Sequence, residues 1–217
     1  MNGEDRRLTS QGIERKQQLL DAAARLFAER GYAETRILDI CREAGVAKGL
    51  FYWYFDTKEA VFRDLADDLR LKLRREQARA MSGHDDPLQR IRQGAEASVR
   101  FMAAHANSFA LMTVENVDRQ FVEDIRRGTE LHADDTERLV RAGIDAGLVR
   151  DEDPRLLAYS VLTTVGWFTH FHRTGRLGLG IDELAAFVGR HIVCSLAASE
   201  QVVRSTLAVA SEPAVTA

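Results

Sequence analysis

Residues 35–55 contain two short helical patterns separated by a glycine, and this spacing restricts the fold more than any other feature of the chain. The first pattern repeats at i, i+3, i+4 and i+7, which places one helix face on Ile37, Ile40, Cys41 and Ala44. Gly45 ends that pattern, and a second helix begins after only a few residues, near Lys48. Two short helices joined by so tight a turn predict a helix-turn-helix.

The rest of the chain also has the pattern of helices. Proline occurs only three times, and there is no long alternating run of β-branched residues. We therefore expect an all-α fold with two domains: a three-helix domain containing the helix-turn-helix, residues 1–56, and a larger helical domain, residues 57–200. Its strongest helices are predicted at 57–82, 155–173 and 182–198. Residues 201–217 are expected to form a frayed tail.

The second short helix carries the aromatic run Phe51-Tyr52-Trp53-Tyr54-Phe55. At 100° per residue Phe51 and Phe55 face the interior, whereas Tyr52 and Trp53 face outward with Lys48 and Gly49. Outward tyrosine and tryptophan offer apolar area to bases and a polar hydrogen to phosphates, and lysine adds charge. This division suits a recognition helix in the major groove of DNA.

An aromatic run in an all-α chain can also be ordinary core packing, and the overall charge does not decide between the two interpretations. The chain has 30 Lys+Arg against 33 Asp+Glu, a net charge of −3, so it is not a polycation. Any affinity for DNA must come from the local placement of basic residues. Lys58, at the start of the next predicted helix, is a candidate for a phosphate contact.

The stretch GYAETRILDICREAGVAKGLFYWYFDTKEAVF, residues 31–62, closely resembles the N-terminal signature of the TetR/AcrR family of transcriptional regulators, GY..T....IA..AGVSKGTLYHYF.SKE.L. The resemblance covers roughly residues 10–65. It implies that the pair Lys48-Gly49 reaches bases, as does Leu50, and that Tyr52 contacts a base or a phosphate. Phosphate contacts are implied for Trp53, Tyr54 and Lys58.

Three positions depart from the family pattern. Ala47 replaces the usual Ser or Thr cap, and Leu50 replaces a polar residue, so Leu50 would read a thymine methyl by contact. Arg36 replaces a usual Thr at the start of the first short helix, where it can supply a salt-dependent phosphate contact.

The resemblance also implies a homodimer, in which the last two large helices of each chain pair into a four-helix bundle. It further implies a cavity for a small apolar or amphipathic effector between the middle helices. The candidate lining residues are Phe62, Leu65, Phe101, Met102, His105, Phe109, Met112, Glu115, Trp167 and Phe171. Among these, His105 and Glu115 would orient a polar group of the effector.

The expected function is that of a ligand-responsive regulator, a repressor that the effector releases from a palindromic operator. Two alternatives stay open: a helical small-molecule-binding protein or enzyme with a structural helix-turn-helix, and an architectural DNA binder without a cavity. No catalytic motif appears, and His170 and His172 lie at i and i+2, which does not suit chelation on a helix. We expect no enzyme activity, cofactor or metal. With no signal peptide or membrane span expected, a cytoplasmic location is predicted.

Overall fold

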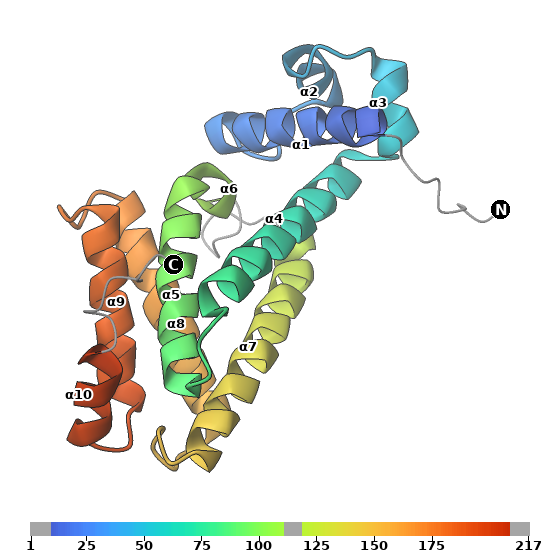
Figure 1. The fold of residues 1–217 in the computed structure, drawn as a ribbon. Helices are drawn as coiled ribbons and strands as arrows, with labels where there is room; N and C mark the ends of the chain where they lie inside the picture. The colour runs from blue at the N-terminus through green and yellow to red at the C-terminus, as the bar shows by residue number, and fades with distance from the viewer. Residues whose placement is uncertain (1–9, 111–118, 209–217) are drawn as a thin grey trace, which may run out of the picture. The chain divides into compact units, whose positions relative to one another are not determined.

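The computed structural model describes residues 10–110 and 119–208, and it confirms the all-α prediction over these ranges (Figure 1). The described residues contain no β-strand, apart from one isolated bridge between Val149 and Ala197. The elements are α1 Ser10–Arg30, α2 Ile37–Glu43, α3 Lys48–Tyr54, α4 Lys58–Met81, α5 Pro87–Ala104, α6 Ala106–Ala110, the 3₁₀-helix η1 Arg119–Phe121, α7 Val122–Asp145, α8 Pro154–Arg173, α9 Ile181–Leu196 and α10 Glu200–Ala208.

The chain divides into two compact units. Of the described residues, the first unit comprises 10–70, 107–110 and 119–125, and the second comprises 71–106 and 126–208. The first unit is therefore larger than the predicted domain 1–56. Its core requires the first turns of α4, since Val61, Phe62 and Leu65 are buried there. It also requires Phe121, which lies far from the helix-turn-helix in sequence.

The core of the first unit is formed by one face of each of its helices. These buried side chains are Leu19, Phe27, Ile40, Phe51, Phe55, Val61, Phe62, Leu65 and Phe121. The sequence prediction that Phe51 and Phe55 face the interior is confirmed. Phe62 stacks on Phe121 with 4.0 Å between ring centroids, so η1 is anchored in this core by an aromatic pair.

The second unit is built around α5, which packs most extensively on α9 and also on α8. Both α5 and α8 begin with an aspartate cap followed by proline: Asp86 and Asp153 accept bonds from backbone amides of the first turn. A buried ion pair lies on α5, where Arg92 Nε donates to Glu96 at 3.0 Å. Gly189 of α9 faces this pair, and a Cβ there would lie 2.5 Å from Glu96 Oε1.

The prediction of a frayed tail from residue 201 is wrong for the described part of that segment. Residues 200–208 form α10, because its apolar positions share one helix face: Val202, Val203 and Leu207 pack against the core of the second unit. Thr206 is buried, and its backbone carbonyl accepts a hydrogen bond from the buried side chain of Gln89. The sequence pattern is misleading here because Ala198-Ser199-Glu200 interrupts the apolar stripe.

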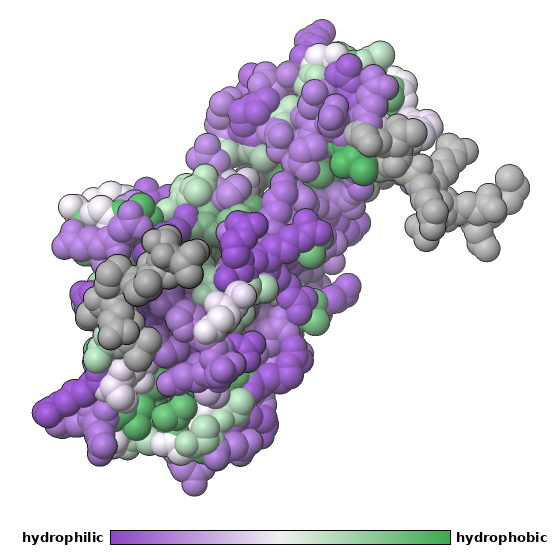
Figure 2. All heavy atoms as spheres, in the orientation of Figure 1, coloured by the Kyte–Doolittle hydropathy of each residue, from purple (hydrophilic) through white to green (hydrophobic). Residues whose placement is uncertain are grey.

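The surface is mostly polar. On the face seen in Figure 2 hydrophilic residues predominate, and hydrophobic residues lie in small separate groups. The large exposed hydrophobic side chains include Tyr52, Trp53, Leu156, Trp167 and Phe187. Among the described helices, none combines the length and the hydropathy that crossing a bilayer requires.

Candidate nucleic-acid interface

Helices α2 and α3 are joined by a turn whose geometry depends on Gly45. This residue has φ +65°, in the left-handed region that favours glycine. The amide of Gly45 donates to the carbonyl of Arg42 at 3.1 Å, and the amide of Val46 donates to that of Cys41 at 2.9 Å. These two bonds form a Schellman motif, which ends α2 sharply and lets α3 start within a few residues. The predicted helix-turn-helix is thereby confirmed.

Helix α3 has one buried face and one exposed face. Phe51 and Phe55 are buried, whereas Tyr52 is 46% exposed and Trp53 is 49% exposed. Lys48 and Gly49 are exposed and Leu50 is half-buried. Two adjacent exposed aromatic side chains beside an exposed lysine offer both apolar area and polar hydrogens to a partner.

The basic and aromatic groups on this exposed face lie close together. The ammonium of Lys48 lies over the ring of Tyr52, 5.7 Å from its centroid. The ring of Trp53 meets that of Tyr54 edge-on at 4.5 Å. Tyr54 is half-buried and packs against the core of the first unit, so only part of it can reach a ligand.

The first turn of α2 presents Arg36 to solvent. Arg36 is the N-cap residue of α2, and its backbone amide donates to Asp39 Oδ2 at 3.2 Å. This local bond fixes the backbone at the cap and leaves the exposed side chain to extend outward. At α3 the cap residue is Ala47, which offers no side-chain bond, as the sequence predicts.

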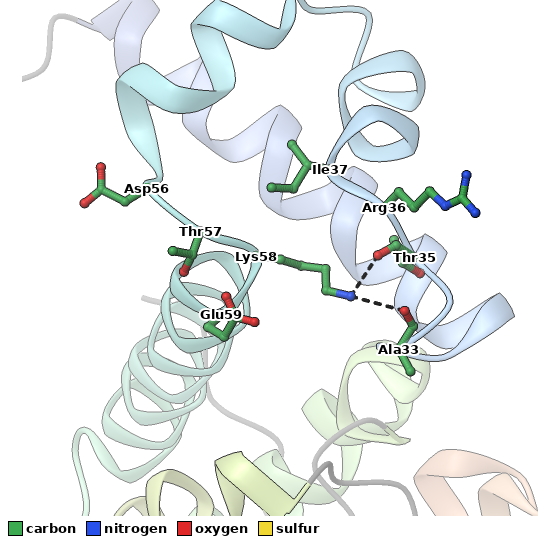
Figure 3. A pocket seen from close by; sticks show the side chains of 8 residues that line it. All are labelled: Ala33, Thr35, Arg36, Ile37, Asp56, Thr57, Lys58 and Glu59. Atoms are coloured by element: carbon green, nitrogen blue, oxygen red, sulfur yellow. Dashed lines mark hydrogen bonds between the residues drawn. The ribbon is translucent and has the colours of Figure 1, made fainter.

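The ammonium of Lys58, for which the sequence predicts a phosphate contact, makes hydrogen bonds within the first unit. It donates to three backbone carbonyls of the loop between α1 and α2, those of Tyr32 at 2.7 Å, Thr35 at 2.9 Å and Ala33 at 3.3 Å. Figure 3 shows the bonds to Thr35 and Ala33. An ammonium has three N–H donors, so these bonds occupy all of them. These carbonyls come from a loop more than twenty residues earlier in the chain, so the sequence alone does not indicate them as partners.

A groove of about 390 Å³ lies between that loop and the start of α4. Figure 3 shows the residues that line it: Ala33, Thr35, Arg36, Ile37, Asp56, Thr57, Lys58 and Glu59. Glu59 accepts a hydrogen bond from the hydroxyl of Tyr32 at 2.9 Å. The pKa of Glu59 is lowered, chiefly by the hydrogen bond from its own backbone amide and then by that from Tyr32.

The predicted effector-lining residues belong to both units. Phe62 and Leu65 are buried in the core of the first unit. Phe109 is half-buried and also belongs to the first unit. The prediction assigned them by position on α4 and on the segment after α5, but the packing of η1 against α4 was not visible in the sequence.

The remaining candidates belong mainly to the second unit. Phe101 is buried and stacks on His105 at 4.1 Å between ring centroids, and Met102 is half-buried beside them. Trp167 is 53% exposed and lies 5.7 Å from the half-buried Phe171. Met112 and Glu115 lie outside the described residues.

Sequence reasoning missed Phe121, Tyr32 and Glu59 as partners within the first unit. Phe121 is fully buried and meets the ring of Tyr32 edge-on at 4.9 Å. Phe121 does stand at helical spacing with Val114, Val117 and Ile125, but this apolar pattern is interrupted by many charged residues and was not used. Tyr32 and Glu59 did stand in the matched signature, but a signature does not state which side chains meet.

Fold and site together define a helical protein with an N-terminal helix-turn-helix and a larger helical domain, the architecture of a one-component transcriptional regulator. Residues 19–65 match the model of bacterial regulatory proteins of the tetR family, and residues 84–195 match a tetracyclin repressor-like C-terminal domain. The chain belongs to the TetR family of transcriptional regulators. This is a family of regulators and not of enzymes.

Several curated regulators are similar to this chain over different lengths. The repressor KstR2 of Rhodococcus jostii is 32% identical over 163 residues, 70% of this chain and 76% of its own. HbdR of Aromatoleum sp. is 29% identical over 69% of this chain and 66% of its own. The uncharacterized regulator YdgC of Bacillus subtilis is 37% identical over 68 residues, 31% of this chain. The match spans 35% of YdgC.

Solved structures share the fold at low sequence identity. The fatty acid degradation regulator FadR from Bacillus halodurans has a TM-score of 0.74 at 19% identity, covering 82% of this chain and 94% of its own. AibR, solved in complex with isovaleryl coenzyme A and operator DNA, has a TM-score of 0.67 at 20% identity. The match covers 81% of this chain and 96% of the AibR chain. At such identities the likeness establishes the fold alone.

Proposed function

We propose that this protein is a ligand-responsive repressor that binds a palindromic operator through α3. The observation that carries the proposal is the division of α3 into two faces. Phe51 and Phe55 hold the core, while the opposite face leaves Lys48, Tyr52 and Trp53 exposed. A surface helix used only for packing usually exposes ordinary polar residues, whereas a lysine with two exposed aromatic side chains suits a recognition helix.

Each exposed group has a role that its chemistry allows. Lys48 and Tyr52 contact base edges or phosphates, Gly49 permits close approach of the backbone, and Leu50 contacts a thymine methyl. Trp53, the outer edge of Tyr54 and Arg36 contact phosphates. Since the net charge of the chain is −3, this local set supplies the attraction to DNA.

The protein acts as a homodimer through α8 and α9. On α8 Leu156 is 68% exposed, and Trp167 is also exposed. On α9 the exposed Phe187 lies 5.3 Å from the ring of Phe168. A two-fold pairing of these helices covers the apolar side chains and presents two recognition helices to half-sites about 34 Å apart.

The effector is a small apolar or amphipathic molecule bound in the second unit, where Phe101, Met102 and His105 are the proposed contacts. The complex of AibR with isovaleryl coenzyme A and operator DNA supports an amphipathic effector class, because AibR shares this fold. Binding to the conformation with low DNA affinity releases the operator, since a few kcal/mol of differential affinity shifts the populations by orders of magnitude. The site of action is the cytoplasm.

The test is to incubate the purified protein with genomic DNA fragments of its source at a stated salt concentration, and to sequence the retained fragments. The proposal expects a short shared palindrome. If the retained fragments share no sequence, the helix-turn-helix binds DNA only nonspecifically. If no fragment is retained, the proposal of DNA binding is wrong.

The substitution Lys48→Ala tests the exposed face on a retained fragment. We expect weaker binding and a shallower dependence of log K on log salt, by about one unit, because one charge-neutralising contact is lost. Tyr52→Ala should also weaken binding. The charge-matched control is Arg79→Ala on the exposed end of α4, which should bind like the wild type. Wild-type affinity in both α3 variants would contradict the assignment of α3.

A further inference from the structure

We infer that Gln77 of α4, Ser98 of α5 and His132 of α7 form the polar end of the effector site, and that this end binds an uncharged group that both accepts and donates a hydrogen bond, as an amide does. The inference rests on the proposed effector binding and adds to it the residues and the chemistry that select the effector. All three residues belong to the second unit, and none of them is among the lining residues that the sequence predicts.

The three side chains meet at one point inside the second unit. The amide nitrogen Nε2 of Gln77 lies 2.9 Å from Oγ of Ser98 and 3.0 Å from Nε2 of His132. Ser98 is buried, and Gln77 and His132 are half-buried. A polar group withdrawn from water costs free energy unless it finds a partner. Three helices that are distant in sequence therefore bring together hydrogen-bonding groups that must be satisfied.

The hydrogen bonds of this cluster have a definite direction. The hydroxyl of Ser98 has one hydrogen, which it donates to the carbonyl of Gly94 at 2.6 Å, so it can only accept from Gln77. The second N–H of the same amide nitrogen is directed at Nε2 of His132. That ring nitrogen therefore accepts and carries no proton, and the neutral imidazole has its proton on Nδ1.

The cluster offers a ligand one donor and one acceptor without a net charge. Burial is the main cause that lowers the pKa of His132; Asp135 raises this pKa and Arg74 lowers it, and these two residues form an ion pair with each other. The free donor is Nδ1–H of His132 and the free acceptor is Oε1 of Gln77, since neither atom has a partner among the described residues. An amide satisfies both atoms, whereas a carboxylate can only accept and would meet Oε1 unpaired.

The cluster adjoins the apolar contacts proposed for the effector. Ser98, Phe101, Met102 and His105 stand at i, i+3, i+4 and i+7, so they share one face of α5. Phe101 and His105 stack with 4.1 Å between ring centroids. From Ser98 to His105 this face extends about 10 Å along the helix. An amphipathic molecule of about that length can place its polar end at the cluster and its apolar chain against Phe101.

The experiment compares octanamide and octanoate, two probes with the same chain length and different polar ends, by titration calorimetry at neutral pH. Wild type should bind octanamide roughly tenfold more tightly, the order of one hydrogen bond left unmade. His132→Phe should remove this preference, and His132→Asn, which keeps a side-chain N–H donor, should restore part of it. The matched control is His84→Phe in the loop before α5, which should keep the preference of the wild type.

Nitrogen-15 spectra of the histidine rings supply a measurement that requires no stable variant at position 132. In the free protein His132 should show a proton on Nδ1 and none on Nε2. Octanamide should shift the Nδ1 resonance of His132 and leave that of His84 in place. Circular dichroism identifies a variant that fails to fold, and the spectra of the wild type then decide.

Three results would overturn the inference. A proton on Nε2 of His132 would contradict the direction of the hydrogen bonds. Equal affinity for both probes, unchanged in His132→Phe, would mean that the cluster selects nothing. Failure of wild type to bind either probe would mean that the cluster takes no such group. The proposed function fails separately, if no apolar or amphipathic compound releases the protein from a retained operator fragment.

Discussion

Lys48 and Lys58 lie ten residues apart in the same unit and have the same side-chain chemistry, yet their surroundings give them different uses. Lys48 is exposed on α3, with its ammonium over the face of Tyr52. Lys58 is half-buried and bonded to carbonyl oxygens. An ammonium that already has protein acceptors must exchange those bonds to contact a phosphate, whereas an exposed ammonium need not. The environment of each lysine therefore decides its role.

Glu59 makes the stability of the first unit depend on pH. Its pKa is lowered in the folded protein, chiefly by its own backbone amide and then by the hydroxyl of Tyr32. A lowered folded pKa means that the contribution is fully present above the unfolded value of about 4.3 and is lost as the pH falls below it. We expect wild type to lose more stability than Glu59→Gln between pH 5 and pH 3, by roughly 1 kcal/mol or less.

Urea unfolding at a series of pH values, followed by circular dichroism, measures this difference. Tyr32→Phe serves as the control, because it removes the hydroxyl donor and keeps the carboxyl group, so its pH dependence should lie between the other two. Superimposable pH profiles for wild type and Glu59→Gln would show that the carboxylate contributes nothing through its bonds.

At the residue scale the sequence predicts exposure better than it predicts partners. The faces of α3 follow from helical periodicity alone, so the burial of Phe51 and the exposure of Trp53 could be predicted. The partners of Lys58 could not, because three loop carbonyls converge only after α1, α2 and α4 have packed. The same holds for Phe121, whose burial depends on a segment far along the chain.

At the scale of elements, α5 and α9 approach closely because α9 has a glycine where they cross. A Cβ at Gly189 would lie 2.5 Å from Glu96 Oε1 and 2.7 Å from its Cγ. Glu96 cannot easily move, since it is buried and its carboxylate accepts from Arg92 at 3.0 Å. A methyl group there must either separate the helices or disturb a buried ion pair.

We expect Gly189→Ala to destabilise the protein by roughly 1–3 kcal/mol, although alanine is the better helix former by about 1 kcal/mol. Thermal and urea unfolding measure the change. The matched control is Gly178→Ala in the loop before α9, where a Cβ meets nothing within 4 Å, and its effect should stay within about 0.5 kcal/mol. An unchanged or raised stability in Gly189→Ala would rule out the close contact between α5 and α9.

The elements themselves were largely predictable, and the errors have local causes. Gly31, Gly45, Gly83 and Gly147 all have positive φ, and each follows a helix at or near a boundary that the sequence predicts. Helix α10 was missed because it is short and its apolar face is recognisable only against the core that it covers. The effector-lining residues stay a prediction, since a cavity is a property of packing between helices and not of any one stripe.

At the scale of the whole molecule, the chain combines a specific N-terminal motif with a helical part that is related to others mainly by fold. The relative KstR2 aligns over 70% of this chain at 32% identity, whereas YdgC aligns over 68 residues only. A DNA-binding unit must fit the same groove in every member, so its sequence is restricted. A helical sensor needs only to bury its core, so the residues that face its ligand can vary.

The proposed dimer is the property of the whole molecule most open to test. Trp167 on α8 and Phe187 on α9 are exposed aromatic side chains on helices whose opposite faces form the core. If a second chain covers them, a charge at either position must be buried without a partner, which disfavours association strongly. We expect Trp167→Glu and Phe187→Glu to sediment as folded monomers of about 24.3 kDa, and the wild type as a dimer.

The matched control is Leu131→Glu, because Leu131 is 52% exposed on α7 and lies outside α8 and α9. It should sediment like the wild type. DNA binding supplies a second measurement, because a monomer reaches only one half-site. The variants Trp167→Glu and Phe187→Glu should therefore bind a full palindrome hardly more tightly than a single half-site, although their α3 is unchanged. If both variants remain dimeric while Leu131→Glu dissociates, the dimer is formed by α7 instead, and the spacing expected between the two recognition helices must be derived anew from that face.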